Sequence, residues 1–240
     1  MTGSCRIVIP TRDGGNWLGA FARAYARLGV RPLYLLDRRT KDDSRVILAG
    51  HDCDVLEVAP EFDRGEDVLW RGAGSTGTEW VLRIDDDEMP SRALLRWFET
   101  EASARPEPAI YVSCRQAWHG GYSRLEEFYF NHARPDFLAP QPRLFRPGRI
   151  SWVTDLHTAG IDATGAGWAP SDAYFLHCDW LVRDRAARTA KLLHYEAQCP
   201  GGGRRNVAYS LPEIQHPERL RITPYETTEF ETLLGDLAAL

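Results

Sequence analysis

The stretch Trp80-Val-Leu-Arg-Ile-Asp-Asp-Asp-Glu-Met-Pro90 joins an apolar run to three consecutive carboxylates. Valine and isoleucine favour an extended chain, so residues 80–84 are predicted to form a buried strand. Pro90 would stop the strand from running on, and Ser91 is a suitable cap for a helix expected over residues 93–100. The three acids therefore fall at the carboxyl end of an internal strand.

Asp85, Asp86 and Asp87 would repel one another strongly in a medium of low dielectric, so a stable fold needs a positive charge beside them. A divalent cation meets this need, because carboxylate oxygens suit Mg²⁺ or Mn²⁺, which often bind substrate phosphates as well. In an extended chain Asp85 and Asp87 point to one side and Asp86 to the other, so the third acid can make a separate contact. A solvated acidic turn explains the triplet equally well on the residues alone.

The composition is that of an ordinary globular protein of one large domain or two small ones. The chain has 240 residues, 43% of them hydrophobic and 26% charged, which suffices for a sizeable core. A net charge of -5 argues against nucleic-acid or anionic-membrane binding. No apolar run approaches the roughly 20 residues of a membrane span, and the first residues lack a signal-peptide pattern. Five scattered cysteines without a Cys-x-x-Cys pair predict reduced thiols and a cytoplasmic location.

Strands and helices alternate along the chain in the manner of crossover units, which predicts an α/β fold with a mainly parallel sheet. Strands are expected over residues 6–9, 33–36, 54–58, 80–84, 110–115 and 173–176. Helices are expected over residues 17–28, 44–49, 63–70, 93–100, 184–195 and 228–240. Ligands bind at the carboxyl ends of parallel strands, so the polar loops there should gather beside the acids. These loops contain Pro10, Thr11, Arg12, Asp13 and Asp37.

The second half is less regular. Residues 118–152 mix aromatic side chains with glycine, proline and arginine, which is typical of an irregular pocket wall. Residues 143–145 and 150–153 are predicted to pair as a hairpin around Pro147-Gly148. On the helix expected over residues 184–195, Arg185, Arg188 and Lys191 share a face that should be solvated, with phosphate contact as the alternative.

Together these features resemble the GT-A glycosyltransferases, family-2-like. The resemblance rests on Ile7-Val-Ile-Pro-Thr-Arg12, on Asp37 closing the second strand, and on Leu82-Arg-Ile-Asp-Asp-Asp87. It covers roughly residues 6–203, and Leu176-His-Cys-Asp-Trp180 resembles the end of a bacterial branch. The resemblance implies a Rossmann-like, mixed but mainly parallel sheet flanked by helices, with an irregular acceptor-side region. Residues 1–117 would bind the nucleotide sugar, 118–203 would form the acceptor side and complete the metal site, and 204–240 would be a tail and helix.

The resemblance further implies metal-dependent transfer of a sugar from a nucleotide-diphosphate sugar to a hydroxyl of a small molecule or soluble glycan. The loop from Pro10 to Asp13 and the carboxylate of Asp37 would hold the base and ribose. Asp85 would contact the ribose or the metal, while Asp87 and His177 would bind Mn²⁺ or Mg²⁺. Asp86 would contact the substrate.

The acceptor side has candidates of its own. An acceptor hydroxyl has too high a pKa to attack unaided, so inverting members of the family need a base. Asp155 is the first candidate and His157 the second, but Thr-Asp-Leu-His departs from the usual family pattern and leaves the base and the stereochemistry open. Three further candidates each have a structural alternative. His119 could contact the acceptor or cap a turn, Arg71 could neutralise a phosphate or lie in solvent, and Trp118 could stack on a sugar ring or belong to the core.

Two other functions remain open. A nucleotidyltransferase on a related sheet would need a Gly-rich loop followed by a basic residue, which Thr11-Arg-Asp-Gly-Gly15 matches poorly. A non-catalytic module that binds nucleotide sugars would keep the fold without turnover. The donor sugar, the nucleotide base, the acceptor and the oligomeric state are not determined by the sequence.

Overall fold

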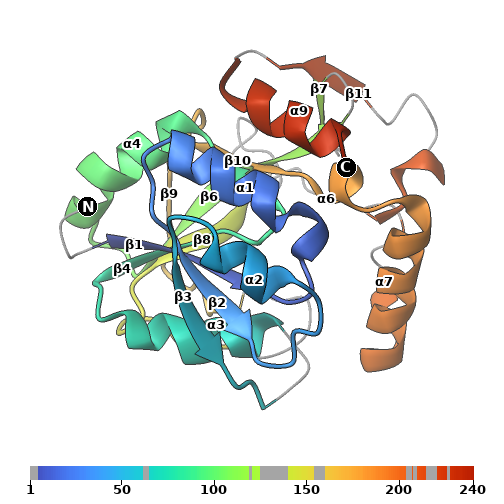
Figure 1. The fold of residues 1–240 in the computed structure, drawn as a ribbon. Coiled ribbons are helices and arrows are strands. Elements are labelled where there is room, and N and C mark those ends of the chain that lie inside the picture. Colours follow the sequence, from blue (N-terminus) through green and yellow to red (C-terminus); the bar gives the residue numbers. More distant parts are fainter. Residues whose placement is uncertain are drawn as a thin grey trace.

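The computed structural model describes residues 5–61, 65–118, 121–124, 140–153, 160–203, 207, 210–214, 221–225 and 228–240 (Figure 1). The strands are β1 (Cys5–Thr11), β2 (Leu33–Asp37), β3 (Asp54–Val58), β4 (Trp80–Arg83), β5 (Glu88–Pro90), β6 (Ala109–Trp118), β7 (Gly121–Arg124), β8 (Gln141–Phe145), β9 (Gly167–Trp168), β10 (Tyr174–His177) and β11 (Arg221–Pro224). The α-helices are α1 (Gly15–Arg27), α2 (Ser44–Ala49), α3 (Gly65–Ala73), α4 (Arg92–Thr100), α6 (Asp179–Val182), α7 (Arg185–Gln198) and α9 (Glu231–Ala238). Short 3₁₀ turns are η1 (Gly74–Thr76), η2 (Ala102–Ala104), η3 (Pro212–Ile214) and η4 (Thr228–Phe230).

One twisted sheet runs through the molecule in the order β11-β7-β6-β8-β4-β1-β2-β3. The half made of β4, β1, β2 and β3 is parallel throughout, as the strand–helix alternation predicts. In the other half β8 runs antiparallel between β4 and β6, while β10 pairs parallel with β6 and antiparallel with β5. The expected fold class, a mixed and mainly parallel α/β sheet, is confirmed.

The inner parallel strands β1, β2 and β4 are buried on both faces of the sheet because their side chains alternate between two cores. Ile7 and Ile9 of β1 pack in the core beneath α1, whereas Val8 packs in the core beneath α3. The two helices cover opposite faces of the sheet (Figure 1). All four residues of β4 are buried, which explains why Trp80, Val81 and Leu82 form an uninterrupted apolar run before Arg83 instead of an alternating pattern. Burying each such Val, Leu or Ile side chain stabilises the fold by about 1.5–3 kcal/mol.

The hairpin expected around Pro147-Gly148 is wrong. The chain does turn there, since the amide of Arg149 donates to the carbonyl of Arg146 at 2.9 Å. However, β8 pairs with β4 and β6, and Trp152 instead forms an isolated bridge with Ile161. Between β4 and β6, the backbone of β8 can form hydrogen bonds on both of its edges. A hairpin partner would satisfy the backbone groups of only one edge.

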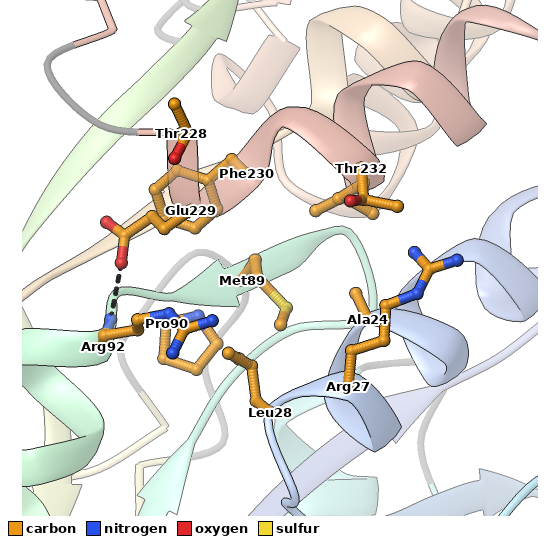
Figure 2. Close-up of a pocket in the computed structure, with 11 residues that line it drawn as sticks. Ala24, Arg27, Leu28, Met89, Pro90, Arg92, Thr228, Glu229, Phe230 and Thr232 are labelled. Atoms are coloured by element: carbon orange, nitrogen blue, oxygen red, sulfur yellow. Dashed lines mark hydrogen bonds between the residues drawn. The ribbon is translucent and has the colours of Figure 1, made fainter.

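The C-terminal segment of η4 and α9 docks onto α1 and the start of α4. One carboxylate oxygen of Glu229 accepts a hydrogen bond from the amide of Arg92 at 2.9 Å, and the other accepts from the hydroxyl of Tyr174 at 3.1 Å. A cavity of about 500 Å³ lies beside this contact and includes Met89 of β5 in its lining (Figure 2). None of the helices in the described residues is long and apolar enough to cross a bilayer.

Candidate functional site

The carboxyl ends of β1, β2 and β4 meet at one edge of the sheet, because these strands are parallel and adjacent. The loops after β1 and β2 are bonded to each other there. Asp13, with a positive φ of 53°, accepts from the amide of Lys41 at 2.7 Å, and the amide of Gly15 donates to Asp42 at 2.7 Å. The hydroxyl of Thr11 donates to Asp86 at 2.6 Å, which links this loop pair to the acidic triplet.

Asp37 closes β2 with its side chain buried, only 1% exposed. It accepts hydrogen bonds from the amide of Arg39 at 2.8 Å and from Nη2 of the same residue at 2.7 Å. Burial alone would raise the pKa of Asp37, but the bonds and charge of Arg39 outweigh it and lower that pKa. The strand therefore ends in a fixed carboxylate, at the position where the sequence places a nucleoside-binding acid.

The three aspartates of the triplet occupy three different environments. Asp85 is held by two arginines, with Nε of Arg83 at 2.8 Å and Nη2 of Arg143 at 3.0 Å from its oxygens. Burial alone would raise the pKa of Asp85, but the charges of Arg143 and Arg83 lower it strongly. Asp86 is bonded to Thr11, and its pKa is raised to about 7 by burial and by the neighbouring charge of Asp87.

Sequence reasoning missed a buried acid directly after the triplet, Glu88. Its side chain is 1% exposed, accepts from Nη2 of Arg143 at 2.5 Å and from the amide of Asp85 at 2.8 Å. Burial raises the pKa of Glu88 to about 7 against the opposing charge of Arg143. The one available signal was its place directly after the triplet, whereas nothing in the sequence connects it to an arginine 55 residues away.

Asp87 meets His177 and Asp179, and the three buried side chains offer ligand atoms that all lie within 4.8 Å of one another. Strand pairing creates this cluster, because β10 runs antiparallel to β5 and places His177 opposite Glu88. The amide of Cys178 then donates to the carbonyl of Asp87 at 2.8 Å, and α6 begins at Asp179. Two predicted metal ligands, Asp87 and His177, are therefore neighbours, and Asp179 joins them although the sequence analysis gave it no role.

Two cations from the following segment already contact these acids. Nη1 of Arg183 bridges Asp87 and Asp179, at 2.5 Å from the latter, and Nζ of Lys191 lies 2.9 Å from Asp179. Nε2 of His177 lies 3.3 Å from Asp87.

The charges in this cluster shift the pKa values of all three clustered side chains. Burial alone would raise the pKa of Asp87 and of Asp179, but the facing cations lower both. Burial alone would lower the pKa of His177, but the carboxylate of Asp87 raises it well above its ordinary value. The cluster therefore favours ionised carboxylates at Asp87 and Asp179, which is the form that binds a cation.

The expected solvated face of the helix over residues 184–195 is wrong for two of its three cations. Arg185 is exposed, but Arg188 is 3% exposed and donates to the carbonyl of Ser210 at 2.9 Å, and Lys191 reaches Asp179. Charge spacing on a helix does not reveal that a buried carboxylate lies beneath it.

The donor set of the Asp87/His177/Asp179 cluster fits a divalent cation. Two carboxylates and an imidazole are ligands that Mn²⁺ accepts readily. Oδ2 of Asp179 is buried, and no hydrogen-bond partner for it is found among the described residues, so this oxygen is open to a cation. Asp85 is not in this cluster, because it is engaged by Arg83 and Arg143. A metal at Asp87 and His177 stays a prediction, and Asp179 is the third ligand that the geometry adds.

The remaining candidates are spread over the structure. Arg71 on α3 is ion-paired with Glu61 at 2.6 Å and with Asp67 at 3.1 Å. Trp118 packs edge-on against Trp180, with ring centroids 5.4 Å apart. Pro10 lies in β1, and Arg12 is the first residue after that strand. Nε of Arg12 lies 3.5 Å from a carboxylate oxygen of Asp13. Three candidates, His119, Asp155 and His157, lie outside the described residues.

The structure matches solved GT-A glycosyltransferases along most of its length. Residues 1–349 of S. aureus TarS match with a TM-score of 0.51 at 11% identity, over 98% of this chain and 80% of that one. Glucosyl-3-phosphoglycerate synthase from Mycobacterium tuberculosis, in complex with Mn²⁺, UDP-glucose and phosphoglyceric acid, matches with a TM-score of 0.53 at 11% identity, over 82% of this chain and 80% of that one.

No protein-family model matches the sequence, and no curated protein matches it. At 11% identity the structural likeness shows the fold alone. The chain therefore has the GT-A fold, the class of architecture that the sequence resemblance implied.

Proposed function

We propose that this chain is a glycosyltransferase that transfers a sugar from a nucleotide-diphosphate sugar to an acceptor hydroxyl with the help of a divalent cation. The observation that carries the proposal is the buried Asp87/His177/Asp179 cluster at the carboxyl edge of a GT-A sheet. A solved structure of similar fold contains Mn²⁺ and UDP-glucose, and another of similar fold, TarS residues 1–349, contains UDP.

The nucleoside would be held by the ends of β1 and β2. Asp37 is a fixed, buried carboxylate, and its two oxygens suit the vicinal hydroxyls of a ribose or the polar edge of a base. Thr11, Arg12 and Asp13 lie in the adjoining turn, which the bonds to Lys41 and Asp42 keep in place. A site whose loops are already bonded loses little conformational freedom when a ligand arrives.

Asp87, His177 and Asp179 would hold Mn²⁺ or Mg²⁺. When bound, such an ion supplies positive charge where the sugar–phosphate bond breaks and negative charge grows on the leaving diphosphate. Arg183 and Lys191 add fixed positive charge at the same place. Asp86, bonded to Thr11, would tie the nucleoside loop to this cluster, and Asp85 would serve as a structural anchor for Arg83 and Arg143.

The acceptor side follows from the resemblance. Asp155 is the proposed base and His157 the second candidate, with His119 and Trp118 as acceptor contacts. The proposed acceptor is a small molecule or a soluble glycan. An Asp155→Asn variant is expected to bind the donor normally and to lose transfer, while full transfer activity would remove Asp155 as the base.

A thermal-shift screen of nucleoside diphosphates, with Mn²⁺ and with EDTA, tests the proposal. A diphosphate at 100 times its Kd stabilises a protein by about 2.7 kcal/mol, which raises the Tm of a chain of this size by about 5–10 °C. We expect such a shift for at least one diphosphate, a smaller one with EDTA, and slow Mn²⁺-dependent hydrolysis of the matching nucleotide sugar. No shift with any nucleoside diphosphate would contradict the proposal. Release of pyrophosphate from a nucleoside triphosphate and a sugar phosphate would instead identify nucleotidyl transfer.

A further inference from the structure

Arg183 lies between the two carboxylates of the proposed metal site. Its Nη1 donates to Oδ2 of Asp87 and, at 2.5 Å, to Oδ1 of Asp179. These are two of the three side chains that would hold the cation. A guanidinium nitrogen and a metal ion would therefore draw on the same two carboxylates, although among the described residues the arginine leaves Asp179 Oδ2 unbonded.

The charges of the cluster balance without any added ion. Asp87 and Asp179 carry two negative charges, and Arg183 and Lys191, which contact them, carry two positive ones. Adding a divalent cation to this arrangement would place three or more like charges within a few ångströms of one another, which low dielectric makes unfavourable. One protein cation has to leave before the ion binds well.

Of the two protein cations, Arg183 is the one that can move to a ligand. Its side chain is 18% exposed, and in the part of the chain that the structure describes no acceptor is bonded to its Nε or Nη2. Its guanidinium carbon lies 4.4 Å from the ring centroid of Trp17, a flat surface over which the group can slide without losing contact. Lys191, in contrast, lies 2.9 Å from Asp179, the one carboxylate it bonds within the described residues, and can remain there as its partner.

We propose that Arg183 is a resident counter-ion that occupies the metal-binding carboxylates until the diphosphate of a nucleotide draws it away. This inference rests on the proposed function, since it names the residue that couples cation binding to donor binding. The planar guanidinium group of arginine can donate two parallel hydrogen bonds to phosphate oxygens. In its present contact Arg183 uses only one nitrogen, Nη1, for both carboxylates, so a phosphate would match the group better. Departure of Arg183 leaves Asp87 and Asp179 open to the ion, so metal and nucleotide would each strengthen the binding of the other.

The test measures Mn²⁺ binding directly, by calorimetry and by the loss of the free-ion signal in electron paramagnetic resonance. In the unaltered protein we expect weak Mn²⁺ binding alone and binding tighter by on the order of tenfold when UDP is present. In Arg183→Met the competitor is gone, so Mn²⁺ alone should bind tighter by on the order of tenfold, the middle of the range for directly contacting groups. UDP should bind this variant more weakly and enhance Mn²⁺ binding less.

Arg146→Met is the matched control. Arg146 is also buried, but it stacks on Trp80 and is paired with Glu79, away from the cluster. We expect this variant to bind Mn²⁺ and UDP as the unaltered protein does. If Arg183→Met does not fold, Arg183→Gln removes the charge but keeps a polar side chain, and its affinity for Mn²⁺ alone should still exceed that of the unaltered protein.

The outcomes separate this inference from the proposed function. Mn²⁺ binding to the Arg183 variants that is no tighter than in the unaltered protein would overturn the counter-ion role, whether or not UDP binds. If no nucleoside diphosphate binds the unaltered protein, the proposed function fails, while tighter Mn²⁺ binding in the variant still supports competition between Arg183 and the ion.

Discussion

Single residues at the carboxyl end of β4 show how three identical side chains acquire different properties. Asp85 faces two arginines, Asp86 faces a threonine hydroxyl, and Asp87 faces a histidine and an arginine. The pKa of Asp85 and of Asp87 is lowered, while that of Asp86 is raised to about 7. Repulsion within the triplet is thus relieved by a separate partner for each acid, and Asp87 is the member that reaches the proposed metal site.

The separate environments allow two neighbouring acids to be told apart. We expect Asp87→Asn to weaken Mn²⁺ binding by at least about tenfold, because a carboxylate is replaced by a weaker neutral ligand. Asp85→Asn should leave Mn²⁺ affinity within about twofold, since Asp85 lies with Arg83 and Arg143 outside the cluster. Calorimetric titration with Mn²⁺ measures both, and an equal loss in the two variants would show that Asp85 is also a ligand.

Asp37 provides a pH-dependent test at a residue outside the metal cluster. A carboxyl group whose pKa is lowered by folding stabilises the protein above its unfolded pKa of about 3.9, and this contribution is lost as pH falls through the folded pKa. We therefore expect Asp37→Asn to lower the free energy of unfolding by about 1–2 kcal/mol at pH 7. Urea denaturation at several pH values should show the difference shrinking below about pH 4. A difference that stays constant down to pH 3 would mean that the charge of Asp37 contributes nothing.

Some of this site can be predicted from the sequence and some cannot. An apolar run followed by acids places Asp87 at a strand end, and His177 follows another apolar run in the same way. The partner Arg183 is 96 residues from Asp87, and their contact exists only because β10 enters the sheet beside β5. Local patterns predict where a strand ends, but they do not predict which strand lies next to it.

Glycines in two helices make a contrasting pair at the scale of the element. A Cβ added to Gly72 of α3 would lie 2.5 Å from a side-chain carbon of Leu35, which is fully buried on β2, whereas a Cβ on Gly235 of α9 meets nothing within 4 Å. Close approach of α3 to the sheet thus requires glycine at position 72.

We expect Gly72→Ala to destabilise the protein by about 1–3 kcal/mol, because overpacking outweighs the better helix propensity of alanine. Gly235→Ala should stabilise it by about 0.5–1 kcal/mol through the same propensity without the clash. Denaturant unfolding of the two variants measures both effects. A stabilising Gly72→Ala would show that α3 moves away from β2 at little cost.

β8 shows what a turn signal can and cannot predict. Pro147-Gly148 correctly marks a reversal of the chain, because proline and glycine adopt turn conformations at low cost. The pairing of β8 with β4 and β6 depends instead on a gap between two strands whose paired residues lie 29 or more positions earlier in the sequence, as from Val112 to Gln141. The regular helices and parallel strands were predictable because their periodicity is local.

At the scale of the whole molecule, the C-terminal segment, residues 228–240, packs against α1 and the start of α4. Glu229 places a carboxylate at the N-terminal end of α4, where it bonds the amide of Arg92 and interacts favourably with the helix dipole. We expect Glu229→Ala to destabilise the protein by about 1–2 kcal/mol and to increase amide exchange in α9.

Hydrogen exchange measured by mass spectrometry would show this change in residues 228–240. Glu231→Ala is the matched control, because Glu231 is exposed on the same segment, and no hydrogen bond of its side chain is found within the described residues. Equal exchange of α9 in the two variants would show that the Glu229 bond does not hold the segment.

At this scale the two halves of the sheet differ in how directly the sequence predicts them. β3, β2, β1 and β4 follow from the alternation of strands and helices, and β1 lies between β2 and β4 as in other parallel sheets that bind ligands at a switch in strand order. The half with β8, β10 and β5 mixes directions, and long-range pairing decides it.

The run His177-Cys178-Asp179 uses three consecutive residues in three different ways: an imidazole, a backbone amide and a carboxylate. Cys178 contributes only its amide to Asp87, and every amino acid except proline has that group. Natural variants of this protein should therefore tolerate small apolar replacements at position 178. A one-residue insertion or deletion in the run, in contrast, would separate imidazole from carboxylate and should be absent from functional genes.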